Sequence, residues 1–239
     1  MSQVMEPAPN YDNAYVRTLF DKMGRTYDVV NLISSFGFSS LWRQQCISLA
    51  HIEAHQLVCD LMAGGGECWR PVLDRDASVI SIDFSHVMVA RQDSLRRKLG
   101  VGVDVRCENA TATSLDSQSV DAVICTFGLK TLSSEATEAL AREVCRILKP
   151  GGHFSFLEIS TARGWWLGPV FRWYVSTVIP VIGKMCLGDI ECYRMLGRYT
   201  NAFDSCEHIV DTFNKAGLST KLRSHFHGCA TSISGTKSA

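Results

Sequence analysis

A glycine-rich turn carries the residues best suited to hold a ligand against the backbone. It follows the short apolar run QLVCDLM and reads Asp60-Leu61-Met62-Ala63-Gly64-Gly65-Gly66-Glu67. Glycines let a ligand approach closely, because a side chain at these positions would block it. A helix beginning after the turn would add free N–H groups and the positive end of its dipole, which suit a carboxylate. A tight turn between a strand and a helix without a ligand fits the same residues.

An acidic residue at the end of the next strand strengthens the ligand-binding interpretation. Asp83 ends the apolar run SVISID. An acid about 20 residues after such a turn, at a strand end, can accept hydrogen bonds from both hydroxyls of a ribose. Asp83 could instead cap a helix, since Phe84-Ser85-His86 follows. Asn109-Ala110 closes the third strand and could meet the edge of an adenine or simply cap a loop.

The turn favours S-adenosylmethionine over NAD as the ligand. It lacks the spacing G-x-G-x-x-G that is typical of dinucleotide sites. A single βαβ crevice without a second mononucleotide-binding half also fits a compact ligand better than a dinucleotide.

Strands and helices alternate through the middle of the chain, which predicts an α/β fold with a mostly parallel sheet. In such sheets ligands bind at the carboxyl ends of the strands. Ser133 or Ser134 can cap the helix that precedes the last of these strands, and Pro150-Gly151-Gly152 can end it. The expected strands are QLVCDLM, SVISID, VDVRCENA, VDAVICTFG and GGHFSFLEIS.

The segments around this core predict one domain over residues 1–239, with four parts. They are an N-terminal helical cap (14–50), the ligand-binding core (55–160), an apolar lid (161–205), and a C-terminal helix with an antiparallel hairpin (206–239).

Composition restricts the class of protein. The 239 residues are 46% hydrophobic, enough for a sizeable core, and 24 basic residues balance 24 acidic ones. The absence of a basic run argues against a nucleic-acid binder that follows the phosphate backbone. The ten cysteines form no C-x-x-C pair and mostly sit in apolar runs, which indicates buried thiols in a reducing compartment. The first residues resemble neither a signal peptide nor a transit peptide.

Several motifs together resemble the ubiquinone/menaquinone C-methyltransferases, within the class I S-adenosylmethionine-dependent methyltransferases. The resemblance covers nearly the whole chain and implies a Rossmann-like fold with a mostly parallel seven-stranded sheet, N-terminal helices and a helical lid insertion. The matching residues are Phe20-Asp21, Tyr27-Asp28, Asn31, Ser35-Phe36-Gly37, Leu41-Trp42, Phe127-Gly128-Leu129, the run from Arg146 to Gly152, Leu157-Glu158 with Ser160, and Tyr193-Arg194 with Leu196.

The resemblance assigns roles to individual residues. Gly64, Gly65 and Gly66 would line the methionine part of S-adenosylmethionine, and Asp83 would hold the ribose. Asn109 and Ala110 would flank the adenine. Thr126 would lie beside the cofactor, with Asp60, Met62 and Phe84 completing its site. Tyr27 would close the site from the N-terminal helices.

The chain also departs from the family pattern near the expected chemistry. Met62 and Ala63 stand where the family has a small residue and glycine, and Lys130-Thr131 stands where it has Arg-Asn. Lys130 follows the fourth strand. When neutral it could take a proton from a hydroquinone, and when charged it could stabilise the phenolate. Lysine does not replace arginine equivalently, because it is a compact ammonium rather than a planar fork.

These departures leave two alternatives to ring C-methylation. One is rhodoquinone formation, in which S-adenosylmethionine donates an amino group with a divalent metal such as Mn²⁺. His225 and His227, two apart on a strand and therefore on one face, are the candidate ligands if a metal binds. The other is a non-catalytic assembly partner in a quinone-making complex. Glu158 could face the pocket or cap the turn after its strand.

The lid predicts contact with a lipid surface. Its run WWLGPVFRWYVSTVIPVIG carries one charge, Arg172, and is broken by Pro169 and Pro180. Residues 165–187 could therefore rest on a membrane surface, or form a buried lid helix or dimer face. The expected partners are a lipophilic quinone-like molecule and a homodimer or quinone-biosynthesis complex. The expected location is the cytoplasm or the mitochondrial matrix, peripheral on the inner membrane.

Overall fold

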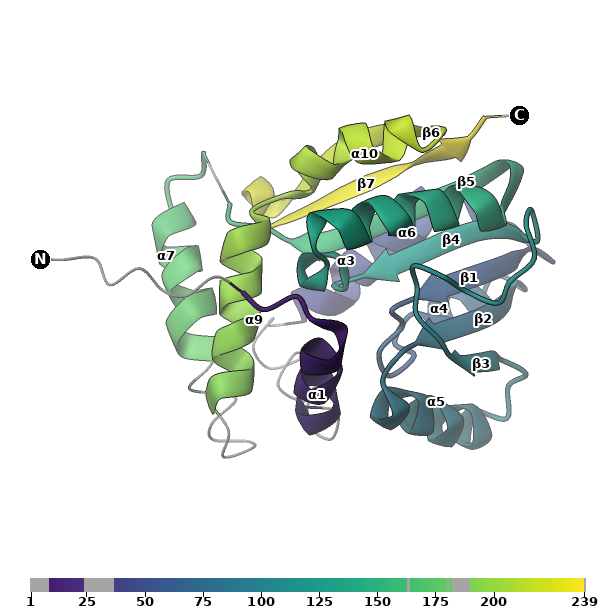
Figure 1. Ribbon diagram of the computed structural model, residues 1–239, viewed down its shortest axis with the longest axis horizontal. Coiled ribbons are helices and arrows are strands. Elements are labelled where there is room, and N and C mark those ends of the chain that lie inside the picture. Colours follow the sequence, from purple (N-terminus) through teal and green to yellow (C-terminus); the bar gives the residue numbers. More distant parts are fainter. Residues whose placement is uncertain (1–8, 24–36, 163, 180, 182–189, 239) are drawn as a thin grey trace, which may run out of the picture.

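The computed structural model describes residues 9–23, 37–162, 164–179, 181 and 190–238. Its centre is a seven-stranded sheet in the order β3-β2-β1-β4-β5-β7-β6 (Figure 1). The strands are β1 (Leu57–Leu61), β2 (Ser78–Asp83), β3 (Asp104–Cys107), β4 (Val120–Thr126), β5 (Leu148–Ile159), β6 (Leu218–His225) and β7 (Ala230–Lys237).

Among the strands that the structure describes, β7 alone runs opposite to the other six. It pairs antiparallel with β5 and with β6, whereas the other neighbouring strands pair in parallel. Parallel neighbours need crossover connections, and the helices between them provide these. The predicted α/β class, the mostly parallel seven-stranded sheet and the C-terminal hairpin are confirmed.

Helices cover both faces of the sheet because successive side chains of a strand point to opposite sides. In β1, Cys59 packs against α6 (Ser134–Ile147) and α10 (Val210–Lys215). Val58 packs on the other face against α3 (Phe38–Leu49) and α4 (Trp69–Leu73), where α5 (His86–Leu99) also contributes. Asp60, two residues after Val58, therefore belongs to the α3 side.

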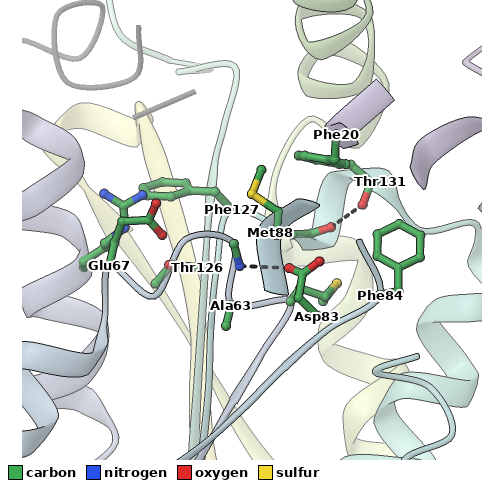
Figure 2. Close-up of a pocket in the computed structure, with 13 residues that line it drawn as sticks. Phe20, Ala63, Glu67, Asp83, Phe84, Met88, Thr126, Phe127 and Thr131 are labelled. Carbon is green, nitrogen blue, oxygen red and sulfur yellow. Dashed lines mark hydrogen bonds between the residues drawn. The ribbon is translucent and has the colours of Figure 1, made fainter. Parts of the chain in front are cut away.

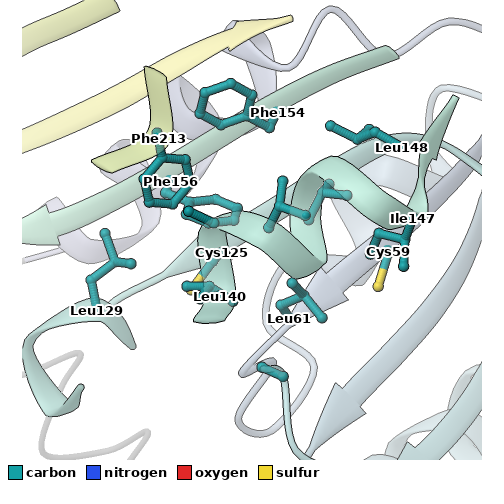
Figure 3. Packing of buried hydrophobic residues seen from close by; sticks show 14 of the residues in the cluster. Cys59, Leu61, Cys125, Leu129, Leu140, Ile147, Leu148, Phe154, Phe156 and Phe213 are labelled. Carbon is teal, nitrogen blue, oxygen red and sulfur yellow. The ribbon is translucent and has the colours of Figure 1, made fainter. Parts of the chain in front are cut away.

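Helix α6 shows how sequence sets these boundaries. The hydroxyl of Ser133 accepts a hydrogen bond from the Ala136 N–H at 3.2 Å and caps the helix, while β5 already begins at Leu148. Pro150, Gly151 and Gly152 therefore lie within β5, after the helix has ended, and do not terminate it. Its buried side chains recur at helical spacing and meet aromatic rings of β5 and α10 (Figure 3). In that cluster Phe213 lies 5.5 Å from both Phe154 and Phe156, centroid to centroid.

The N-terminal and lid helices gather at one end of the sheet (Figure 1). They are α1 (Asn13–Met23), α7 (Gly168–Trp173), the π-helical turn Tyr174–Val178 and α9 (Ile190–Phe203). Val16, Leu19 and Met23 of α1 pack against Met195 and Tyr199 of α9, which joins cap and lid. Within the described residues, no helix is long and apolar enough to cross a membrane.

Candidate cofactor pocket

A pocket opens at the carboxyl ends of β1, β2 and β4, the edge where the sheet topology places ligands. The space between its lining residues, part of it open to solvent, measures about 490 Å³. Figure 2 shows Glu67 toward one side of this pocket and Phe84 toward the other. Its lining consists of Phe20, Arg43, Met62, Ala63, Gly64, Glu67, Asp83, Phe84, Met88, Thr126, Phe127, Gly128 and Thr131.

The glycine turn is held by contacts from two other elements. Gly64 donates its N–H to Asp83 Oδ2 at 2.8 Å and accepts a hydrogen bond from Gln92 Nε2 at 2.7 Å. Gly66 has a φ of 89°, and a Cβ there would lie 2.8 Å from the Trp69 ring. Glycine at position 66 is therefore required by the protein's own packing as well as by any ligand.

The helix after the turn differs from expectation. It begins only at Trp69 and is five residues long. Of the three glycines of the turn, Gly64 alone is among the described residues that line the pocket. The helix predicted after the turn is present, but none of its residues is among the described lining of the pocket, so its N-terminus does not border the ligand space.

Asp83 is fixed at the pocket as an acceptor and does not cap the next helix. Its Oδ1 accepts the Ser85 N–H at 2.9 Å, while the Ser85 hydroxyl caps α5 by accepting the Met88 N–H at 3.2 Å. Burial raises the pKa of Asp83 to about 6, and the N–H donors of Ser85 and Gly64 oppose that shift. Each carboxylate oxygen retains a lone pair for a ligand hydroxyl.

Met62, a departure from the family pattern, packs against the opposite wall. It has a φ of 53°, which is unfavourable for a side chain with a Cβ. A Cβ built on Gly128 would lie 2.8 Å from Met62 Sδ, so the thioether fits only because residue 128 is glycine. Both residues line the pocket. Met62 therefore narrows the pocket beside the turn.

Three neighbouring ionisable side chains each have a buried polar atom that makes no hydrogen bond. Arg43 Nε, Asp60 Oδ2 and Glu67 Oε1 are buried and have no hydrogen-bond partner. Burial raises the pKa of Asp60 to about 8 and also raises that of Glu67, while the positive charge of Arg43 lowers both. The guanidinium of Arg43 lies over the Phe127 ring, 5.1 Å from its centroid. Arg43 and Glu67, but not Asp60, are among the residues that line the pocket, and their unsatisfied polar atoms are consistent with a polar ligand there.

Lys130 lies behind the pocket wall. Its Nζ donates to Glu158 Oε1 and to the Phe127 carbonyl, both at 2.8 Å, and it is absent from the described lining. Glu158 is fully buried and also accepts the backbone N–H of Lys130 at 3.1 Å. The carboxylate of Glu158 thus hydrogen-bonds to Lys130 in the interior, and neither Lys130 nor Glu158 is among the described residues that line the pocket.

The expected adenine residues lie beside Asp83 but outside the pocket lining. The Glu108 N–H donates to the Asp83 carbonyl at 3.1 Å, which places the end of β3 next to the end of β2. Asn109 is exposed, and its Oδ1 accepts the Thr111 N–H at 3.0 Å, whereas Ala110 is buried. Thr126 and Phe84 do line the pocket. Tyr27 lies outside the described residues.

His225 and His227 do not share a strand face, so that expectation is wrong. Strand β6 ends at His225, whose Nε2 hydrogen-bonds Ser232 Oγ at 2.8 Å. His227 lies in the following turn with a φ of 55°, and its exposed ring stacks on Trp165 at 5.3 Å. In the described part of the chain, no three His, Cys, Asp or Glu side chains are placed to hold a metal.

Sequence reasoning missed several pocket residues. Arg43 directly follows Leu41-Trp42, and Glu67 ends the glycine turn, so both lay next to segments already identified. Met88 and Thr131 carried no chemical signal of their own. Met88 reaches the pocket because α5 begins at His86, three residues after Asp83, and Thr131 reaches it because it follows the turn at Phe127.

Comparison with known families and proteins gives a consistent result. The model of the ubiE/COQ5 methyltransferase family matches residues 9–237. A demethylmenaquinone methyltransferase of Lactiplantibacillus plantarum is 32% identical over 94% of this chain and 96% of its own length. A ubiquinone/menaquinone biosynthesis C-methyltransferase, UbiE, of Rubrivivax gelatinosus is 29% identical over 94% of this chain and 87% of its own.

Solved structures share the fold at low identity. A SAM-dependent methyltransferase from Aquifex aeolicus superposes with a TM-score of 0.58 at 15% identity, covering 81% of this chain and 88% of its own. The [4+2]-cyclase SpnF gives a TM-score of 0.64 at 15% identity, with 98% of each chain covered. Because a cyclase and a methyltransferase both match, these structures show the architecture and not the reaction.

Proposed function

The chain belongs to the ubiE/COQ5 methyltransferase family, and we propose that it transfers a methyl group from S-adenosylmethionine to a ring carbon of a prenylated quinol or a similar lipophilic aromatic. One observation carries the choice of chemistry. The pocket joins the glycine turn and Asp83, which suit a nucleoside, to a wall of aromatic and thioether side chains, which suits an apolar ring.

The pocket residues fit the cofactor that the family uses. Asp83 offers acceptors for ribose hydroxyls, Phe84 and Thr126 border the same space, and the unpaired charges lie farther along the turn. When bound, S-adenosylmethionine supplies an electrophilic methyl group on a sulfonium. The protein then needs to align the acceptor carbon, exclude water and let a proton leave.

The apolar lining suits the acceptor. Phe20 from the N-terminal cap, Phe127 after β4 and Met88 from α5 reach the pocket from three directions. Such surfaces bury a planar ring by contact area and leave a ring carbon free to face the methyl donor. Phe20 ties this wall to the cap, so we propose that the cap encloses the ring.

In this proposal Lys130 supports the pocket wall and does not contact the ring of the substrate. Its ammonium already donates to Glu158 and to the Phe127 carbonyl. Among the described lining residues the titratable side chains are those of Arg43, Glu67 and Asp83. We therefore assign Lys130 to positioning Phe127 and leave the proton of the quinol to a group at the pocket.

The mass of the quinol product tests the reaction type. The purified protein is incubated with S-adenosylmethionine and a short-tailed demethylated quinol, with and without Mn²⁺. A gain of one methyl group that is independent of Mn²⁺ is expected. A metal-dependent exchange of a methoxy for an amino group would replace C-methylation with the rhodoquinone reaction, and no product with any quinol would favour a non-catalytic partner.

The lid surface supports a membrane partner. Trp166, Val170 and Trp173 follow helical spacing and are 81%, 57% and 58% exposed, whereas Arg172 points inward and donates to the Thr161 carbonyl at 3.2 Å. Tryptophans suit the boundary between water and lipid. We propose that this face rests on a bilayer, from which a prenylated substrate can enter.

Flotation with liposomes tests the lid surface. Changing Trp166 and Trp173 together to Ser should reduce recovery with liposomes, while Trp165→Ser serves as a contrast because Trp165 is packed against Phe226 and His227. Unchanged flotation of the double variant would contradict the proposal. A shift of that variant from dimer to monomer in light scattering would instead assign the face to a second copy of the chain.

A further inference from the structure

The unpaired charges near Phe127 come from separate parts of the chain. Arg43 belongs to α3, Asp60 follows the centre of β1, and Glu67 ends the glycine turn. Arg43 is 8% and Asp60 only 1% exposed. Since a buried charged atom without a partner is costly, three such atoms in one place need an explanation.

Arg43 and Glu67 border the pocket, whereas Asp60 lies behind it. The carboxylate of Glu67 folds back over the turn, because a Cβ on Gly65 would lie 2.9 Å from Oε1 and one on Gly64 would lie 3.3 Å from Oε2. Arg43 is held over the Phe127 ring. A cationic and an anionic side chain thus line the same pocket, and each also has a buried hydrogen-bonding atom without a partner.

A ligand group with both signs of charge would complete the cluster. A carboxylate alone would leave Glu67 unpaired, and an ammonium alone would leave Arg43 unpaired. An α-amino acid group carries both charges within one short segment. It also lies at the opposite end of S-adenosylmethionine from the ribose that Asp83 would hold.

We propose that Arg43 and Glu67 form a clamp for the amino-acid end of the cofactor, with Arg43 binding the carboxylate and Glu67 the ammonium. The clamp rests on the proposed use of S-adenosylmethionine. It replaces the helix N-terminus that the sequence suggested for the carboxylate. It also makes the N-terminal cap part of the cofactor site, since Arg43 comes from α3.

Two probes separate this clamp from the rest of the site. S-adenosylhomocysteine has the amino-acid end, and 5′-methylthioadenosine has the same adenosine and thioether without it. In calorimetry, Arg43→Met and Glu67→Gln should each weaken S-adenosylhomocysteine by about 10- to 100-fold, since each removes a charged hydrogen bond. Binding of 5′-methylthioadenosine should stay within about threefold of the unchanged protein.

A conservative variant and the pattern of losses across the two probes test the clamp further. Arg43→Lys should recover part of the affinity for S-adenosylhomocysteine, because it keeps the charge but not the planar fork. An equal loss for both probes, or no loss for either, would overturn the clamp while leaving the cofactor assignment intact. If the unchanged protein bound neither probe, the proposed function would fail first, and the clamp with it. Glu67→Gln is nearly isosteric and guards against a misfolded Arg43 variant.

Discussion

Lys130 and Glu158 form an ion pair in the interior, with Nζ 2.8 Å from Oε1 and side chains only 4% and 0% exposed. Nζ also donates to the carbonyl of Phe127, a residue with a φ of 65°. A non-glycine residue in this conformation needs support from its surroundings. The pair therefore connects the end of β5 to the strained turn that forms the pocket wall.

Removing one partner of this pair should destabilise the fold. Lys130→Met leaves the Glu158 carboxylate buried and unpaired, so the free energy of unfolding should fall by about 3–5 kcal/mol. The double variant Lys130→Met with Glu158→Leu should lose less than Lys130→Met alone, because no buried charge remains. Urea unfolding monitored by circular dichroism measures both. A fully stable Lys130→Met protein without turnover would instead identify Lys130 as a catalytic residue.

Asp83 should make nucleoside binding depend on pH. Its pKa is raised to about 6, so below that pH the carboxyl is increasingly protonated and loses an acceptor for the ribose hydroxyls. Affinity for 5′-methylthioadenosine, which lacks an amino-acid group that titrates, should rise as pH increases from 5 to 7. Asp83→Ala should weaken binding by about 1–3 kcal/mol at pH 7.

Asp83→Asn gives the matched control for the pH effect. The amide cannot ionise, so the rise in affinity between pH 5 and 7 should disappear in calorimetry. If the same pH dependence persisted in the Asn variant, another group would be responsible, and the assignment of Asp83 to the ribose would lose its support.

Met62 and Gly128 should be energetically coupled. Gly128→Ala places a Cβ 2.8 Å from Met62 Sδ and should cost about 1–3 kcal/mol of stability through overpacking. In a Met62→Gly background the same change should cost clearly less, since both the Met62 sulfur and the Met62 Cβ, which would lie 2.9 Å from the new Cβ, are gone. Thermal unfolding of the four proteins completes the cycle. Equal costs of Gly128→Ala in both backgrounds would show that the two side chains do not compete for space.

The sheet and the position of Asp83 beside the glycine turn were predictable from the sequence. Alternating strands and helices fix the layer order, and the spacing of the glycine turn from Asp83 reflects a strand, a crossover and a second strand. Ser133 and Ser85 cap their helices through local contacts that depend on neighbouring residues only. Such local and periodic signals survive in a single sequence.

The meeting of Arg43 and Glu67 at one pocket and the place of Lys130 were not predictable in this way. Arg43 and Glu67 meet only after α3 packs on the sheet, and nothing in their spacing records that contact. Lys130 and Glu158 are 28 residues apart and pair because β4 and β5 are neighbours. The prediction that His225 and His227 share a strand face failed because β6 ends at His225, two residues before His227.

The position of a transferred label tests the central claim most directly. S-adenosylmethionine carrying a trideuterated methyl group is incubated with the purified chain and a demethylated quinol, and the product is examined by NMR and tandem mass spectrometry. The intact trideuterated methyl is predicted on a ring carbon, with S-adenosylhomocysteine formed in equal amount. A label on a quinol oxygen, or a product without the label, would contradict ring C-methylation by this protein.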